Sequence, residues 1–394
     1  MAQKFYLRQN VYDAAKERIA YLLDEFDDFV VGFSGGKDST ICLNLTIEVA
    51  REKGKLPVKV LFLDQEAEWD TVIDYVRRTM NRDEVEPLWF QIPLKLFNST
   101  STTDMWLECW EPDKEWIRPK EPNSIKENHY GTDRFAELFT KIFEKDFADR
   151  TICYIAGVRA EESPTRMMGL TEGQTYKHIT YGKYLNKKLG HYTFYPLYDW
   201  SYTDVWKAIH DNDWDYCEIY DYMYQHGVPV RDMRVSNVHH ETAVKSLYYL
   251  QEIEADNWNR IVKRIKGINT AGMIKEDAFY VKELPFMFKS WREYRDYLLD
   301  NLIEDPENHA TFKKNFDKAD EVFTFDKSAD KSACKVAITS ILKNDYHMTT
   351  FNNFLRSPEI NTYKKYKSGK INKVREVNKH LEDEYGSIIY VIKD

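Results

Sequence analysis

Six consecutive residues, 34–39, have the types and order needed to hold a phosphate. Their sequence is S-G-G-K-D-S, and they lie between a short apolar run at residues 29–33 and an amphipathic stretch, which predicts a strand, a tight turn and a helix. Glycine lets the turn curl, so that backbone amides, the Lys37 ammonium and the Ser39 hydroxyl would converge on a phosphate or pyrophosphate. Asp38 would add a carboxylate for Mg²⁺. The alternative is an ordinary glycine turn, and the spacing is not that of a Walker A loop.

An acidic turn follows the next predicted strand. Residues 58–63 have the composition of a buried strand, and D-Q-E-A-E-W begins at residue 64. A strand, helix and strand in this order make parallel neighbours whose carboxyl ends share one edge of the sheet, where ligands bind. We therefore expect Asp64 or Glu66 to contact a nucleotide or its Mg²⁺ there. A solvated turn is the alternative.

Further strands are predicted at residues 88–94 and 151–158, and two arginines follow the second of these. The sequence G-V-R-A-E-E-S-P-T-R continues from its end. Arg159 and Arg166 are predicted to clamp phosphate or sulfate oxygens, because the planar guanidinium can donate two parallel hydrogen bonds. The alternative is a surface ion-pair patch in which Glu161 and Glu162 partner the arginines.

The S-G-G-K-D-S run resembles the PP-loop of the N-type ATP pyrophosphatases. This superfamily cleaves ATP between its α and β phosphates and includes sulfate adenylyltransferases and phosphoadenosine phosphosulfate (PAPS) reductases. The acidic turn and the G-V-R motif are similar to those at the matching strand ends of these families, as is Y-P-L-Y-D-W-S-Y-T-D-V-W at residues 195–206. M-R-V-S at 233–236, with the histidine pair after it, resembles the PAPS reductase-like group that includes the immunoglobulin-binding regulator IbrA. The resemblance covers about residues 25–265.

The motifs and the resemblance together predict a fold and a set of site residues. The fold is α/β, a doubly wound, mostly parallel sheet of the adenine nucleotide alpha hydrolase-like kind, over residues 1–255, with a helical accessory domain at 256–394. The residues expected to take part in catalysis are Lys37, Asp38, Arg159 and Arg166, and Asp38 is the expected metal ligand. The residues expected to bind the nucleotide are Phe33, Ser34, Gly35, Gly36, Lys37, Asp38, Ser39, Asp64 and Glu66.

The cysteines separate this chain from the reductases that it resembles. PAPS reductases carry a catalytic cysteine near the C-terminus, and related proteins hold an iron–sulfur cluster on clustered cysteines. This chain has five isolated cysteines and none after Cys334. Forming a thiosulfonate requires a thiol nucleophile, so we expect neither reductase chemistry nor an iron–sulfur cluster or zinc site. We also expect no metal at His239, His240 and Glu241, because adjacent residues on a helix diverge by about 100°.

Three functions agree with these residues. In the first, an oxygen of an unknown acceptor attacks the α-phosphate of ATP, the acceptor is adenylylated and pyrophosphate leaves. In the second, PAPS is the nucleotide and the chain is a sulfotransferase-like or reductase-like enzyme. In the third, the chain is a non-catalytic nucleotide-sensing or nucleic-acid-binding regulator. ATP or PAPS, with Mg²⁺, is the cofactor that these hypotheses require.

The C-terminal third has a different pattern from the rest. Helices are predicted at residues 258–268, 290–303, 307–322, 331–344 and 370–384. The basic stretch 363–375 is either a solvated helix face or a contact for nucleic acid or a protein partner.

The net charge of −9 argues against indiscriminate binding of nucleic acid. With no apolar run of membrane-spanning length and no signal peptide, a cytoplasmic protein without a membrane partner is expected.

Two aromatic stretches each allow two interpretations. Residues 95–131 form a long connection with Trp106, Trp110 and Trp116, which either covers the substrate as a lid or staples the connection to the domain. Residues 176–192 interleave basic and aromatic side chains. That pattern suits a surface that stacks bases, and it equally suits a β-hairpin whose aromatic side faces the core.

Overall fold

The computed structural model divides the chain into two compact units, which are described separately. The first unit contains residues 1–96, 108–237 and 253–257, and the second contains residues 97–107, 238–252 and 258–394. The residues whose structure is described within these ranges are 7–97, 106–171, 176–177, 179, 181–235, 238, 250–265, 268, 281, 283–323, 327–357, 360–361 and 365.

The first unit is built on a six-stranded sheet with the order β3-β2-β1-β6-β8-β7. Its strands are β1 (Asp28–Gly32), β2 (Val58–Leu63), β3 (Val85–Phe90), β6 (Ile152–Ile155), β7 (Gly182–Asn186) and β8 (His191–Phe194). Neighbouring strands are parallel except for β7, which pairs with β8 in the antiparallel sense. A small separate sheet pairs β4 (Leu94–Phe97) with β5 (Trp106–Cys109).

Strand β1 lies at the centre of the sheet and fixes where the sequence motifs meet. Its residue Val31 is opposite Val60 of β2 on one side and Ile155 of β6 on the other. The apolar side chains of β1 are buried, as expected for a parallel sheet covered on both faces. The loops after β1, β2 and β6 therefore lie side by side at one edge of the sheet.

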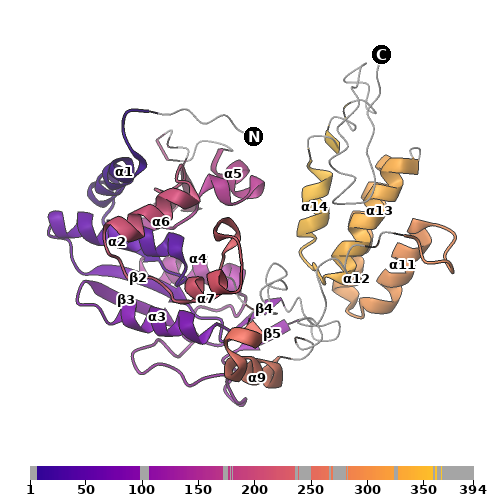
Figure 1. Ribbon diagram of the computed structural model, residues 1–394, viewed down its shortest axis with the longest axis horizontal. Helices are drawn as coiled ribbons and strands as arrows, with labels where there is room; N and C mark the ends of the chain where they lie inside the picture. The colour runs from indigo at the N-terminus through magenta and orange to yellow at the C-terminus, as the bar shows by residue number, and fades with distance from the viewer. Residues whose placement is uncertain are drawn as a thin grey trace. The chain divides into compact units, whose positions relative to one another are not determined.

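Helices cover the sheet of the first unit. They are α1 (Val11–Glu25), α2 (Lys37–Glu52), α3 (Asp70–Met80), α4 (Phe135–Asp146), α5 (Pro164–Thr171), α6 (Tyr202–Asp211) and α7 (Ile219–Gln225), with the short 3₁₀ helices η1 (Ala160–Glu162) and η2 (Val230–Asp232) (Figure 1). Helix α2 packs beside α3, where the Thr40 and Tyr75 hydroxyls are 3.0 Å apart. Helix α4 packs the ring of Phe143 against Tyr154 of β6.

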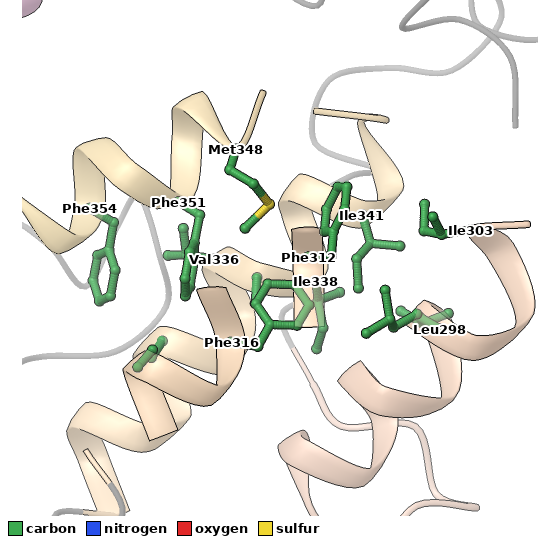
Figure 2. Packing of buried hydrophobic residues seen from close by; sticks show 14 of the residues in the cluster. Leu298, Ile303, Phe312, Phe316, Val336, Ile338, Ile341, Met348, Phe351 and Phe354 are labelled. Atoms are coloured by element: carbon green, nitrogen blue, oxygen red, sulfur yellow. The ribbon is translucent and has the colours of Figure 1, made fainter. Parts of the chain in front are cut away.

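The second unit is helical. Its described helices are α11 (Trp291–Leu302), α12 (Pro306–Phe323), α13 (Lys327–Leu342) and α14 (Thr349–Leu355), and α9 (Ala255–Arg264) runs across the division between the units. Figure 2 shows its apolar core, in which Phe312, Phe316, Ile338 and Phe351 from three helices are fully or almost fully buried. Inside this unit the buried Arg295 pairs with Asp320 at 2.7 Å.

The predicted fold class is confirmed: the fold is α/β with a mostly parallel central sheet and a helical C-terminal part. The predicted helices at 258–268, 290–303, 307–322 and 331–344 correspond to α9, α11, α12 and α13. The helix predicted at 370–384 lies outside the described residues, and the domain boundary at 255 and 256 stays a prediction.

The structure divides one predicted strand into two and supports one of the two interpretations of residues 176–192. A single strand is predicted at residues 88–94, whereas the structure has β3, ending at Phe90, and then β4. The break comes where the backbone turns to another partner: the amide of Gln91 donates to the carbonyl of Ile125 at 2.9 Å. For residues 176–192, the hairpin interpretation holds for β7 and β8, and the ring of Tyr192 packs 5.8 Å from that of the buried Phe26.

No helix among the described residues is both long enough and apolar enough to cross a membrane.

Candidate functional site

Helix α2 begins after Gly36, which has no side chain to cap it, and the Tyr220 hydroxyl takes one of its first amides, that of Lys37, at 2.9 Å. Its N-cap residue Gly36 is extended, with φ −82° and ψ 157°, and makes no side-chain capping bond. Gly35 has φ +71°, and a Cβ there would be 2.8 Å from Val72, so only glycine fits the turn. The first amides of a helix bind an anion when no side chain takes them. The local fold has the geometry that such a site requires, and the anion site itself stays a prediction.

The two serines of the loop are joined to each other. The backbone amide of Ser34 donates to Oγ of Ser39 at 3.2 Å, and Ser39 Oγ donates to the carbonyl of Gly36 at 2.8 Å. These bonds hold the loop closed on the first turn of α2. Phe33, which precedes them, is buried and packs its ring 5.6 Å from that of Tyr75, so its side chain belongs to the core.

Lys37 is buried at this helix end. Its Nζ donates to the backbone carbonyl of Met233 at 2.8 Å and lies 3.6 Å from the Asp38 carboxylate. Burial lowers the pKa of Lys37, and the neighbouring Asp38 partly offsets this effect. The ammonium also lies 5.2 Å from the centre of the Tyr220 ring. Lys37 is thus held in place by groups from a distant part of the chain.

The buried Arg159 and the partly exposed Asp38 form an ion pair that joins two strand ends. Nε of Arg159 donates to Asp38 Oδ1 at 2.5 Å, and the arginine is only 4% exposed. Within the described part of the chain, the buried Nη1 of Arg159 has no hydrogen-bond partner. The loop after β6 thus brings a cation with a spare N–H group to the loop after β1.

Gly157 allows this pairing, because α2 passes very close to the loop after β6. A Cβ at position 157 would be 2.6 Å from the backbone carbonyl of Asp38 and 2.8 Å from the amide of Ser39. Real Cβ atoms do not approach so closely, so glycine is needed here for contact rather than for its φ. The sequence motif contains this glycine, but the motif alone does not reveal the neighbour that requires it.

Arg166 differs from Arg159 in its burial and in its partner. Its side chain is 47% exposed and pairs with Glu162 at 2.8 Å. Burial raises the pKa of Glu162, and that carboxylate also accepts from the amide of Arg159 at 3.3 Å. The ion-pair alternative therefore describes Arg166, whereas Arg159 points into the candidate site.

Asp64 is fully buried and fully engaged by protein groups. Its Oδ1 accepts from the amide of Glu66 at 2.9 Å and from Arg118 at 2.6 Å. Its Oδ2 accepts from Trp89 and Gln91, each at 2.9 Å. A carboxylate offers about four acceptor positions, so none is left for a nucleotide or metal ion. This geometry departs from the predicted ligand role and makes Asp64 a group that organises the strand end.

Glu66 has a comparable role. It is buried with φ +64°, and its carboxylate accepts from the backbone amides of Trp110 at 2.6 Å and Ile117 at 3.2 Å. Trp110 is itself fully buried and donates from its indole to the Asp64 carbonyl at 2.9 Å. For Trp110, the staple interpretation of the long aromatic connection agrees with these contacts.

Several residues of the site belong to no sequence motif. Tyr220 is one of them, and its hydroxyl accepts from the amide of Lys37 at 2.9 Å. Arg118 reaches Asp64 from within the aromatic connection, and two of its buried guanidinium nitrogens have no partner among the described residues. These contacts join residues far apart in the chain, so no local pattern could have indicated them.

All five cysteines lie in the described part of the chain, and all are buried and outside disulfide bonds. Burial raises the pKa of Cys217 and Cys334 to about 12 and raises that of Cys42 and Cys153 as well. A thiol attacks as the thiolate, and these environments disfavour that form. The structure therefore offers no activated thiol among these four residues.

Metal binding is tested by the groups near the loop. The described residues contain no cluster of three or more histidine, cysteine, aspartate or glutamate side chains suited to a metal ion. Mg²⁺ is often held by one carboxylate together with phosphate oxygens and water, and Asp38, which is partly exposed, fits that role. His239, His240 and Glu241 lie outside the described residues, as does the basic stretch 363–375 apart from Lys365.

The fold and this loop define an α/β protein with a glycine loop and a helix N-terminus at the carboxyl edge of a parallel sheet. The family model described as Phosphoadenosine phosphosulfate reductase domain matches residues 28–226. The chain belongs to this family, which confirms the predicted likeness to the PAPS reductase-like branch of the PP-loop superfamily. A second model, Domain of unknown function (DUF3440), matches residues 227–381.

Individual proteins resemble the chain to different degrees. It is 32% identical over 321 residues to the uncharacterized protein YbdN of Escherichia coli (strain K12), covering 78% of this chain and 79% of that protein. Candida glabrata FMN adenylyltransferase in complex with FMN and an ATP analogue aligns with a TM-score of 0.35 and 14% identity, over 60% of this chain and 66% of that one. The chain thus spans just under two thirds of that enzyme's length.

A PAPS reductase from Candida auris, solved as a phosphate complex, aligns with a TM-score of 0.32 and 12% identity. The alignment covers 60% of this chain and 99% of that one.

Proposed function

We propose that the first unit binds ATP by its phosphates and cleaves it between the α and β phosphates, transferring the adenylyl group to an acceptor. The observation that carries this proposal is the N-terminus of α2, whose N-cap Gly36 makes no side-chain capping bond, with Lys37, Asp38 and Arg159 beside it. Three positive features, namely the helix end, the buried lysine and the spare N–H of the arginine, lie around the Asp38 carboxylate, and Glu162 is close enough to interact with Lys37 as well. This combination suits a polyphosphate accompanied by one divalent cation.

The chemistry needs no protein nucleophile. An acceptor oxygen would attack the α-phosphorus, the bond from that phosphorus to the bridging oxygen would break, and the electron pair would leave with pyrophosphate. An acceptor that is already an oxyanion has no proton to lose. Lys37 and the amides of α2 would stabilise the leaving pyrophosphate, and Arg159 would hold the α-phosphate or the acceptor. Mg²⁺, when bound at Asp38, would neutralise charge on the phosphate oxygens.

The other predicted site residues have supporting roles in this proposal. Ser34, Gly35, Gly36 and Ser39 would shape the loop, with Phe33 anchoring it in the core. Asp64 and Glu66 would act indirectly, by holding the loop after β2 in shape. Arg166 would reach the acceptor only by leaving Glu162, so we assign the clamp to Arg159 first.

PAPS is the second candidate nucleotide, because the family to which the chain belongs is described by PAPS reductase. The buried cysteines do not favour reduction through a thiolate, so transfer of the sulfonate group to another acceptor would be the form of this alternative. The third candidate function is that of a regulator that binds the nucleotide without turnover.

One incubation separates these functions. The full chain is mixed with Mg²⁺ and either ATP or PAPS, and every nucleotide product is identified by mass. Pyrophosphate with AMP or an adenylated acceptor supports the proposal, whereas ADP with phosphate contradicts it. Lys37→Ala should abolish product formation, and Lys207→Ala, which removes an exposed lysine of α6, is the matched control. Nucleotide binding that Lys37→Ala weakens, with no product from either nucleotide, would favour the regulator.

A further inference from the structure

Tyr220 lies beside the phosphate loop, residues 34–39, although it belongs to a helix far along the chain. Helix α7 brings it beside the start of α2 (Figure 1). Its hydroxyl oxygen accepts from the backbone amide of Lys37 at 2.9 Å and lies 3.5 Å from the position that a Cβ on Gly36 would take. The phenol oxygen therefore already occupies one edge of the anion site.

The ring of Tyr220 is held firmly. It is 3% exposed, and it packs edge-on against Trp206 with ring centres 5.2 Å apart. The Lys37 ammonium lies 5.2 Å from the centre of the same ring. A side chain with only two rotatable torsions, packed on both sides in this way, places its hydroxyl with little freedom.

The hydroxyl has one hydrogen-bonding group to spare. A phenol oxygen can accept from one group while its own O–H donates to another. Among the residues that the structure describes, no acceptor is found for that proton. Burial raises the pKa of Tyr220 well above its ordinary value, so the hydroxyl stays a donor at neutral pH.

We propose that the Tyr220 hydroxyl binds the ligand directly, by donating to a non-bridging oxygen of a di- or triphosphate held at the loop. This inference rests on the proposed function and adds a residue to its site. Tyr220 would bridge protein and ligand, accepting from the Lys37 amide on one side and donating to phosphate on the other. A hydrogen bond to a charged oxygen in a buried site is stronger than one between neutral groups.

The test uses Tyr220→Phe, which keeps the ring and removes only the hydroxyl. Binding of inorganic pyrophosphate, ATP and adenosine to the full chain is measured by calorimetry in the presence of Mg²⁺. We expect the affinities for pyrophosphate and ATP to fall by about 10- to 100-fold and the affinity for adenosine to stay unchanged. A purely structural role for Tyr220 would change the affinity for adenosine as well.

Tyr216→Phe is the matched control. Tyr216 also packs edge-on against Trp206, with ring centres 5.6 Å apart, but its hydroxyl donates to Asp221 rather than pointing at the loop. Its loss should leave pyrophosphate affinity within about twofold of the original.

The possible failures are distinguishable. If the unaltered chain binds pyrophosphate and Tyr220→Phe binds it equally well, the inference about Tyr220 is overturned and the proposed function stands. If the unaltered chain binds neither pyrophosphate nor ATP, both are overturned. Should Tyr220→Phe not fold, a crystal structure of the unaltered chain with pyrophosphate decides: a phenol oxygen within about 3.2 Å of a ligand oxygen supports the inference, and any longer separation refutes it.

Discussion

Two arginines that look alike in the sequence behave differently in the structure. Arg159 is buried against Asp38, whereas Arg166 is half exposed and pairs with Glu162. An exposed ion pair contributes little to stability, but removing one member of a buried pair leaves an uncompensated charge. Only the partner and the burial, which the sequence does not contain, distinguish these two residues.

This difference predicts unequal effects on folding. Arg159→Ala should lower the free energy of unfolding by about 1 to 3 kcal/mol, because the Asp38 carboxylate loses its closest partner and keeps only Lys37, at 3.6 Å. Arg166→Ala should lower it by less than about 1 kcal/mol. Urea denaturation of the two variants measures both values. Equal losses for the two would contradict the assignment of Arg159 to the more buried of the two pairs.

Glu68 gives the molecule a pH dependence of known sign. Burial, with a smaller effect from the charge of Asp64, raises its pKa from 4.5 to about 8. Between these pH values the folded chain keeps a proton that the unfolded chain releases. The free energy of unfolding should therefore fall as the pH rises through this window, by up to about 1.4 kcal/mol per pH unit from this group.

Glu68→Gln should remove this component, because glutamine stays neutral throughout. The measurement is urea denaturation from about pH 5 to about pH 9, with the exposed Glu86→Gln on β3 as control. Glu68→Gln and Glu86→Gln proteins with the same dependence on pH would show that the Glu68 carboxyl is not held neutral in the folded chain.

At the level of elements, the site depends on how closely α2 and the loop after β6 approach. The sequence predicted the loops after β1, β2 and β6 at one edge of the sheet because a strand, helix and strand with short connections can hardly fold otherwise. It did not predict the contacts that close the site. Tyr220 lies 183 positions from Lys37, and Met233 lies 196 positions from it, so no periodicity or motif spacing could reveal them.

The same limit applies to Asp64. The sequence placed it correctly at the end of β2, as an apolar run followed by an acidic turn indicates. Three of its four partners, Trp89, Gln91 and Arg118, lie 25, 27 and 54 positions further along. Whether a carboxylate at a strand end is free or saturated depends on such partners, and the local pattern is the same in both cases.

Gly157→Ala should disturb the site through packing alone. The added methyl group would lie 2.6 Å from the backbone of Asp38. Relieving this clash requires α2 and the loop after β6 to move apart. We expect a loss of about 1 to 3 kcal/mol in the free energy of unfolding and at least tenfold weaker binding of pyrophosphate. Thermal denaturation and calorimetry measure the two effects.

Gly169→Ala supplies the comparison. Gly169 lies in α5, and a Cβ there would meet nothing within 4 Å. Alanine favours a helix over glycine by about 0.5 to 1 kcal/mol, so this variant should be slightly more stable and bind pyrophosphate normally. A Gly157→Ala protein that behaves in the same way would rule out the close approach.

At the scale of the whole molecule, each unit has a core of its own. The second unit buries Phe312, Phe316 and Phe351 among its helices, and Phe316 also carries the Arg295 guanidinium 5.0 Å from its ring centre. The sequence indicated helices in this part of the chain from their spacing. Its one functional indication there, the basic stretch 363–375, lies outside the described residues apart from Lys365.

Phe316→Ala should therefore affect the two units differently. Removing this ring from the core should lower the stability of the second unit by about 3 to 5 kcal/mol, whereas the phosphate loop should keep its affinity for pyrophosphate. Calorimetric scans with and without pyrophosphate report both. Loss of binding in the variant would mean that the loop depends on the second unit.

The five cysteines, all buried and outside disulfide bonds, give this protein built-in reporters of local unfolding. Four of them lie in the first unit and Cys334 in the second, so alkylating reagents should modify the native chain slowly and the denatured chain at every sulfur. Peptide mapping after brief exposure to iodoacetamide would then show which unit opens first under stress. For the same reason, a fluorophore could be attached at an added surface cysteine without first removing the natural ones.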